Sequence, residues 1–280
     1  MTIRNAIEET FGQTTGVMTA LLGKAGEAHA VGASRRSFFA RTAALAGASA
    51  MGAAGLGLLQ PVAAAASGAA DAVTPESLKS ILDIAATAES LATTFYFNAL
   101  ASGSLPNVNS DANRNYFQAA AVQEFEHLVI LDHLGGAPLA TEFYFPANMF
   151  SDESVFFPTA SLLEDYFISA YIAAAREFSG AVVKGIPTAD PNAIGLALQI
   201  GGIECEHRAL LRVASNSNPP NNRIIESALI KRVKDAATAL APFLSGGSGY
   251  TGPFKMPGKS AVNAIALPFG FASFPKYKIF

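Results

Sequence analysis

Two Glu-x-x-His motifs constrain this chain more than any other feature of its sequence. Glu124 and His127 form the first motif, and Glu204 and His207 form the second. In an α-helix, residues at positions i and i+3 lie about 60° apart and one turn along the axis, so both side chains can reach one metal ion. The motifs therefore predict that two helices bring two carboxylates and two imidazoles to one buried site.

Coincidence is a poor explanation for the two motifs. A single Glu-x-x-His pair is common on surface helices and indicates little by itself. After residue 66 the chain has three histidines, and two of them follow a glutamate by three positions. Chance would produce this in roughly one of a hundred chains of such composition. The third, His133, is interpreted as a helix-end histidine stabilised by the helix dipole.

The residues inside the motifs should face elsewhere. Glu126 and Glu206 lie two positions after the first glutamate of their motif, which turns them about 160° away on the helix. We expect both to be solvated. Cys205 also points away from the site and is interpreted as a small buried residue. Because it is the only cysteine, an intrachain disulfide and a cysteine-based zinc site are excluded.

Proline, glycine and capping residues divide the chain after residue 72 into helices. Thr74 followed by Pro75 and Glu76 is a helix-start signal, Asp190-Pro191 repeats it, and Ser110-Asp111 can cap another helix. No segment shows the alternation of a half-buried strand, so the fold class is all-α. The expected helices span about residues 74–101, 110–135, 159–184, 190–214 and 223–241.

Loop lengths predict how these helices connect. Short loops join the first helix to the second and the third to the fourth, whereas residues 136–158 separate the second from the third. Two antiparallel hairpins with one long crossover is the connectivity of a ferritin-like four-helix bundle. We expect this helical domain over residues 72–242, including the fifth helix. Residues 243–280, rich in glycine, proline and aromatic residues, are expected to be an irregular tail packed on the bundle.

The first and third helices add two matched carboxylates. Glu89 is followed seven positions later by Tyr96, and Glu164 by Tyr171, which places each pair on nearly one helical face. We expect both glutamates to be metal ligands. Both tyrosines are interpreted as core residues whose hydroxyl finds a partner, which for either could be a metal-bound carboxylate. With Glu124 and Glu204 they make four negative charges, which balance two divalent ions.

Glu164 has an alternative interpretation. Ser161-Leu162-Leu163-Glu164 also fits a capping box, which would place this glutamate at the start of a helix instead of in the core. In that case Glu177 would be the substitute ligand.

The paired sequences around these ligands resemble one branch of the ferritin-like proteins. Residues 88–96 and 163–171, together with the two Glu-x-x-His motifs, are similar to the desiccation-related ferritin-like proteins over about residues 72–240. The resemblance implies that the glutamates of the second and fourth helices bridge two ions and that each histidine is a terminal ligand. It therefore implies bridging by Glu124 and Glu204, and terminal ligation by His127, His207, Glu89 and Glu164.

The N-terminal region predicts export. Arg35-Arg36 and the following phenylalanines precede an apolar stretch over about residues 42–59 and a small-residue run at 62–66. This order resembles a twin-arginine (Tat) signal, so residues 1–66 are interpreted as a cleaved signal region and the location as periplasmic or otherwise extracytoplasmic. The alternative is a membrane anchor, for which an apolar stretch rich in alanine and glycine is short.

Two functions remain open at this stage. The first is a di-metal oxidoreductase, ferroxidase- or catalase-like, whose two divalent ions (Fe or Mn) react with oxygen or peroxide. The second is a metal-binding stress protein without turnover, and a purely structural metal site is a third. The expected partners are metal ions and small oxidants, with no stable membrane insertion after signal cleavage and with homo-oligomerisation left open. A net charge of −3 without a Lys/Arg cluster argues against nucleic-acid binding.

Overall fold

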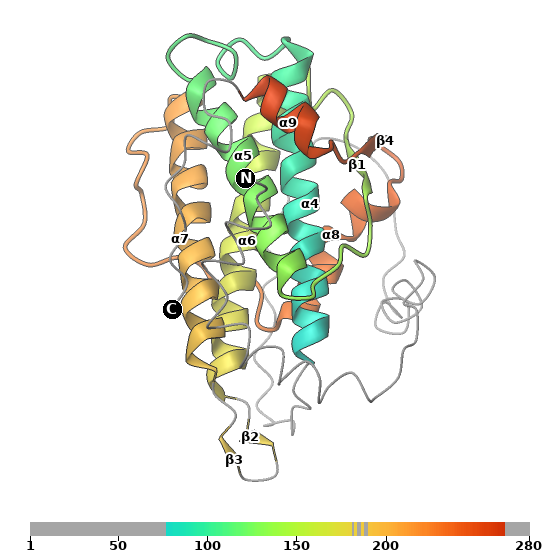
Figure 1. The fold of residues 1–280 in the computed structure, drawn as a ribbon. Helices are drawn as coiled ribbons and strands as arrows, with labels where there is room; N and C mark the ends of the chain where they lie inside the picture. The colour runs from blue at the N-terminus through green and yellow to red at the C-terminus, as the bar shows by residue number, and fades with distance from the viewer. Residues whose placement is uncertain (1–76, 181, 184–185, 188–189, 267–280) are drawn as a thin grey trace, which may run out of the picture.

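Four long helices form the body of the protein (Figure 1). The computed structural model describes residues 77–180, 182–183, 186–187 and 190–266. The signal region 1–66, the Thr74-Pro75-Glu76 signal and residues 267–280 of the tail lie outside the described residues. The bundle helices are α4 (Leu78–Ser102), α5 (Arg114–His133), α6 (Glu153–Gly180) and α7 (Pro191–Ala214).

The bundle consists of two hairpins, which confirms the predicted fold class. Helix α4 packs mainly on α5, and α6 packs mainly on α7. A small hairpin of β2 (Val182–Val183) and β3 (Ile186–Pro187) joins α6 to α7. The crossover from α5 to α6 runs back along the bundle, so both of these helices begin at the same end (Figure 1). Among the described residues, no helix is long and apolar enough to cross a membrane.

Helix α7 begins as its sequence predicts. The carboxylate of Asp190 accepts hydrogen bonds from the backbone N–H groups of Asn192 (3.0 Å) and Ala193 (3.1 Å), and Pro191 occupies the first helical position. Proline suits this position because its missing N–H would have no partner inside the helix. At the start of α4, Ser77 takes the same role for the backbone N–H of Ser80.

Helix α5 begins later than its sequence suggests. Asn113 is the residue before the helix and makes no side-chain capping bond. Ser110 lies in the preceding turn, where its backbone oxygen accepts from the N–H groups of Asn113 (3.1 Å) and Arg114 (2.8 Å). The predicted cap at Ser110-Asp111 is therefore wrong. The turn satisfies these N–H groups through a backbone oxygen, and a local sequence pattern cannot distinguish that arrangement from a side-chain cap.

Helix α6 begins before Pro158, although we expected it to begin after this residue. The carboxylate of Asp152 accepts from the backbone N–H (2.8 Å) and the hydroxyl (2.6 Å) of Ser154, which starts the helix at Glu153. Pro158 then lies inside the helix and removes only one helical hydrogen bond. The sequence Ser161–Glu164 is consequently mid-helix and is not a capping box.

The crossover and the tail pair with each other, which the all-helical prediction missed. Strand β1 (Glu142–Pro146) in the crossover pairs antiparallel with β4 (Tyr250–Lys255) in the tail. The backbone of Gly252 has φ +145°, and a Cβ there would lie 2.7 Å from the carbonyl oxygen of Phe143. Glycine therefore allows the two strands to approach this closely.

The fifth helix differs from the prediction. Residues 223–232 are not helical, and a 3₁₀ turn, η1 (Val233–Asp235), leads into α8 (Ala236–Ser245), which contains Pro242. Both terminal nitrogens of Arg223 bind the carboxylate of Asp165 on α6, at 2.6 and 2.7 Å. Glu226 binds Arg208 on α7 at 3.1 Å. The ion pairs of Arg223 and Glu226 hold residues 223–232 against the bundle. The helical pattern of the sequence alone predicts that these two charged side chains face solvent.

A last helix covers the outer face of α5. Helix α9 (Lys259–Ile265) packs against α5 and α4, and the backbone oxygen of Ile265 accepts from the amide of Gln118 at 2.9 Å. Its Val262 is buried with Val122 and Phe125 of α5. The described part of the tail therefore lies on the bundle.

We predict that the Asp190 cap contributes measurably to stability. Replacing Asp190 by alanine should lower the free energy of unfolding by about 1 kcal/mol, because two N–H groups at the start of α7 lose their partner. Denaturant unfolding followed by circular dichroism measures this change. The matched control is Asp111→Ala, an exposed residue ahead of α5, which should change stability by less than about 0.5 kcal/mol. Equal losses in the two variants would contradict this interpretation of α7.

Candidate metal centre

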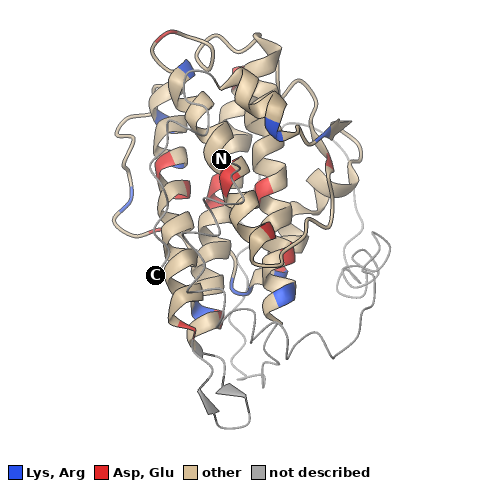
Figure 2. Ribbon diagram, in the orientation of Figure 1, with Lys and Arg blue, Asp and Glu red and all other residues tan. Residues whose placement is uncertain are grey.

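The six predicted ligands meet in the middle of the bundle. Each comes from a bundle helix: α4 and α6 contribute one glutamate each, and α5 and α7 contribute one Glu-x-x-His motif each. Figure 2 shows acidic residues on neighbouring helices around mid-height of the bundle. All six side chains are buried, and three of the glutamates are fully inaccessible to solvent. The set is Glu89, Glu124, His127, Glu164, Glu204 and His207.

Three carboxylates surround His127. Its Nδ1 atom lies 3.3 Å from Oε2 of Glu89, 3.4 Å from Oε2 of Glu124 and 3.2 Å from Oε1 of Glu204. Because one ligand atom from each of these four residues lies within 4.8 Å of the others, the group could hold a metal ion.

A second group surrounds His207 and shares two of the same carboxylates. The Nδ1 atom of His207 lies 2.9 Å from Oε1 of Glu124, 3.2 Å from Oε2 of Glu204 and 4.0 Å from Oε1 of Glu164. These four residues also present ligand atoms within 4.8 Å of one another. Glu124 and Glu204 thus offer one oxygen to each group and lie between the two histidines.

Two tyrosines each donate a hydrogen bond to a glutamate of the other hairpin. The hydroxyl of Tyr96 on α4 donates to Oε1 of Glu164 on α6 at 2.5 Å. The hydroxyl of Tyr171 on α6 donates in turn to Oε1 of Glu89 on α4. Each tyrosine therefore fixes the glutamate of the opposite hairpin, and for Glu89 this leaves Oε2 facing His127.

Gln123 orients one histidine, and sequence reasoning missed this residue. Its Oε1 lies 2.9 Å from Nε2 of His207. When the ring is neutral, Nε2–H donates to Gln123 and the lone pair of Nδ1 faces the carboxylates. Gln123 precedes Glu124 directly, and no spacing rule marks it, because only the packing of α5 against α7 brings it to the ring.

Several carboxylate oxygens in the centre are buried without a hydrogen-bond partner. They are both oxygens of Glu124, Oε2 of Glu164 and Oε1 of Glu204. A buried charged oxygen without a partner is costly, and the cost falls when a cation or a proton binds. Four carboxylates and two imidazoles in two overlapping groups fit a pair of divalent cations, which would supply the partners that these oxygens lack.

The charges in the centre shift one another's pKa in opposite directions. Burial raises the pKa of Glu124, and the nearby Glu204 and Glu89 raise it further. Burial also raises the pKa of Glu164. For Glu204, burial acts in the same direction, but the close approach of His127 and His207 to its two oxygens outweighs it and lowers the pKa.

Both histidines bind protons more tightly than usual. Burial lowers the pKa of His127, but the neighbouring carboxylates, Glu89 first, outweigh it and raise the pKa well above 6.5. For His207, the carboxylates of Glu204 and Glu164 likewise outweigh burial. Protons and metal ions would therefore compete for the same atoms of the centre.

Three glutamates that the sequence analysis considered lie outside the centre: Glu126, Glu177 and Glu206. Glu206 is exposed as expected, but Glu126 is only 8% exposed, and burial raises its pKa to about 7. The expectation of a solvated Glu126 was wrong because the tail helix α9, with Lys259 close enough to lower this pKa, packs over α5. Glu177 accepts from the backbone N–H of Val233 at 2.8 Å and belongs to no ligand group among the described residues. Cys205 is half-buried, and burial raises the pKa of its thiol.

Comparison with known families agrees with the helix pairing and the centre. The profile of the family described as "ferritin-like domain" matches residues 78–217, half of the chain. The chain belongs to this ferritin-like family. Neither a curated protein nor a solved structure matches it. The family match confirms the predicted membership of the ferritin-like superfamily and spans all six residues of the centre.

The raised pKa values predict how the stability of the metal-free ferritin-like protein depends on pH. Folding raises the pKa of four groups in the centre: Glu124, Glu164, His127 and His207. Their contribution to the free energy of unfolding is therefore present at low pH and is lost as pH rises through the folded-state pKa. The pKa of Glu204 is lowered, so its contribution to stability is lost as pH falls, and this loss occurs below its ordinary pKa of 4.5. The melting temperature should therefore fall as pH rises from about 5 to about 9.

Calorimetry with a chelator present measures this slope. The Glu124→Gln variant should show a shallower slope, because its amide stays neutral at every pH. Addition of a divalent metal should reverse the slope, since metal binding displaces protons from these groups. A melting temperature of metal-free protein that rises over the range would contradict the prediction.

Proposed function

We propose that this ferritin-like protein binds two divalent ions, iron or manganese, and reacts with dioxygen or peroxide. The observation that supports the proposal is the position of Glu124 and Glu204, each of which offers one oxygen to each of two buried ligand groups. A single-ion site would not require carboxylates shared in this way. Oxygen and nitrogen donors of this kind suit iron and manganese.

Each ligand has a distinct role in the proposal. Glu124 and Glu204 would bridge the ions. His127 and Glu89 would complete one coordination sphere, and His207 and Glu164 would complete the other; this arrangement follows the two groups of close ligand atoms. The four negative charges would then be balanced by two divalent cations, so the buried centre would carry no net charge.

The chain's own residues prepare the site for redox chemistry. A bound pair of divalent ions supplies two electrons, which with two protons reduce dioxygen to hydrogen peroxide, or hydrogen peroxide to two water molecules. Burial, with the neighbouring carboxylates, raises the pKa of Tyr96 and of Tyr171, so both phenols stay protonated and keep donating to Glu164 and Glu89. Apolar side chains around the centre exclude bulk water.

Metal analysis of natively produced protein tests the proposal. We predict two iron or manganese ions per chain, and none in the Glu124→Ala plus Glu204→Ala variant, which removes both shared carboxylates. Gln123→Leu should keep the fold and weaken metal binding roughly 10- to 100-fold, because His207 loses the partner that orients its ring. Glu206→Ala is the matched control, an exposed glutamate on the same helix as Glu204, and should bind metal like the original protein. Equal metal in the double variant would contradict the proposed site.

Assays of the metal-loaded protein separate an enzyme from a stress protein. Oxidation of ferrous ion by dioxygen, or breakdown of peroxide, with many turnovers per chain supports an oxidoreductase. Two ions per chain without turnover would instead support the desiccation-related, non-catalytic interpretation.

We propose further that the protein is exported through the Tat pathway after it folds and loads metal in the cytoplasm. The support is the Arg35-Arg36 pair and the apolar stretch that follows it. Replacing residues 1–66 with a Sec-type signal should change the metal content of the exported protein, because that chain folds after transport. Arg35→Lys plus Arg36→Lys should retain the protein in the cytoplasm with its metal unchanged. Identical metal content after Sec export would contradict loading before export.

A further inference from the structure

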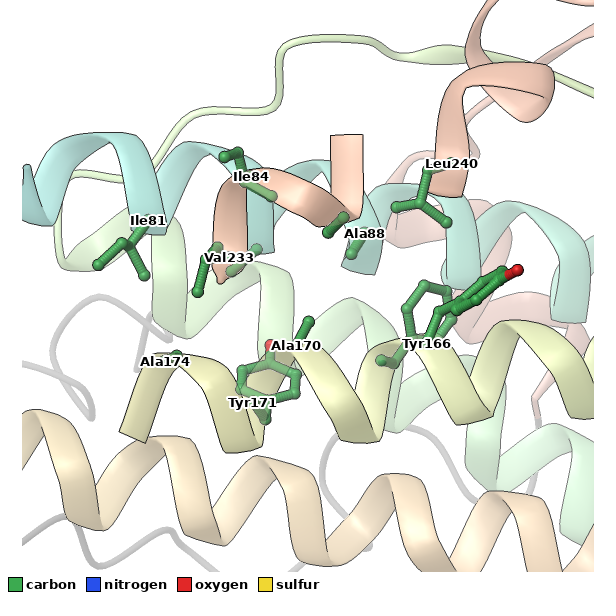
Figure 3. A pocket seen from close by; sticks show the side chains of 12 residues that line it. Ile81, Ile84, Ala88, Tyr166, Ala170, Tyr171, Ala174, Val233 and Leu240 are labelled. Atoms are coloured by element: carbon green, nitrogen blue, oxygen red, sulfur yellow. The ribbon is translucent and has the colours of Figure 1, made fainter. Parts of the chain in front are cut away.

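A small apolar cavity lies beside one half of the centre (Figure 3). It has a volume of about 20 Å³ and lies between α4, α6 and the segment formed by η1 and α8. Figure 3 shows the side chains from these elements turned toward a common space. The side chains that define it include Ile81, Ile84, Ala88, Ala170, Val233 and Leu240.

A second apolar cavity, of about 30 Å³, lies next to the first. The two share Ile81, Ala85, Tyr171 and Ala174 among their lining residues. The small side chains of Ala85 and Ala174 leave this space open, and the ring of Tyr171 forms one wall of both cavities. Each of the two apolar cavities therefore borders Tyr171.

Tyr171 connects this space to the centre. Its ring lines both cavities, whereas its hydroxyl donates to Oε1 of Glu89, a proposed ligand. Ala88, which also lines the first cavity, is the neighbour of Glu89 in the chain. A molecule in either cavity would therefore lie against a side chain that is hydrogen-bonded to a residue of the His127 group.

The other half of the centre is packed differently. Tyr96 has Phe95 at 4.1 Å, His207 at 5.6 Å and Phe117 at 6.2 Å between ring centroids. Neither of the two cavities touches Tyr96. The two tyrosines make matching hydrogen bonds, but of the two only Tyr171 lines these cavities.

We propose that these cavities bind dioxygen and that this gas approaches the centre from the Tyr171 side. A volume of this size holds one or two molecules as small as water. The alkyl lining offers water and hydrogen peroxide almost no hydrogen bonds, so both would lose more on entry than an apolar diatomic molecule. The lining of these cavities thus favours dioxygen over peroxide as the molecule that approaches the centre from this side. Its use as the oxidant rests on the proposed function, whereas gas binding does not.

Xenon, which occupies apolar cavities that water leaves empty, tests the binding site directly. Crystals of the metal-free full chain under xenon pressure should show a xenon atom beside Ala85 and Tyr171. Ala85→Leu should remove it, because Ala85 lines both cavities and a larger side chain there would fill them, and Ala170→Leu fills the first cavity from α6 if the former variant does not fold. Ala101→Leu, at an exposed alanine of α4, is the matched control and should keep the xenon site. No xenon in the original protein, or xenon retained in both filled variants, would overturn the proposal.

Kinetics with the iron-loaded protein then test the route. The KM for dioxygen should rise roughly tenfold in Ala85→Leu, equivalent to about 1.4 kcal/mol of lost binding, with kcat unchanged and with the peroxide KM unaltered. Equal changes in Ala101→Leu, or a fall in kcat alone, would overturn the route. If the protein holds no metal, the proposed function fails and the oxidant role with it, while the xenon result still decides whether the cavity binds gas.

Discussion

Four buried carboxylates at mid-bundle are the constraint on which the rest of this structure depends. Glu124, Glu164 and Glu204 have no solvent contact, and several of their oxygens have no hydrogen-bond donor. A chain cannot bury this much negative charge unless protons or cations compensate it. Burial and the neighbouring carboxylates raise the pKa of Glu124, and the carboxylates raise the pKa of both histidines, so protons can supply part of this compensation. Metal binding and proton release are therefore two sides of one equilibrium.

The same carboxylates tie the two hairpins together. The glutamate of α4 receives its hydrogen bond from a tyrosine of α6, and the glutamate of α6 receives its bond from a tyrosine of α4. Glu124 and Glu204 come from different hairpins as well, and each approaches both histidines. Neither hairpin can complete a ligand group alone, so correct packing of α4 and α5 against α6 and α7 and assembly of the centre are the same event.

The sequence predicted the centre better than its surroundings. Glu-x-x-His spacing and the seven-residue Glu–Tyr interval are local properties of a helix, so they survive errors in helix boundaries, such as the earlier start of α6. What failed depended on contacts distant in sequence: the burial of Glu126 under α9, the ion pairs of Arg223 that replace a fifth helix, and the β1–β4 pairing. Gln123 belongs to this class too, since only its contact with a ring on α7 gives it a role.

Two similar hairpins would give a symmetric centre, but their surroundings differ. Around Tyr96 lie the rings of Phe95 on α4 and Phe117 on α5, and Phe156 on α6 contacts both of these rings, so this side is packed with aromatic side chains. Around Tyr171, small residues such as Ala85 and Ala174 leave room. The charge of the bound ions would restrict which residues can serve as ligands. The residues that pack around the ligands can differ between the hairpins as long as the packed volume is conserved or a cavity is tolerated. The same kinds of candidate ligand therefore surround both histidines, whereas one side of the centre is packed with aromatic rings and the other is bordered by apolar space.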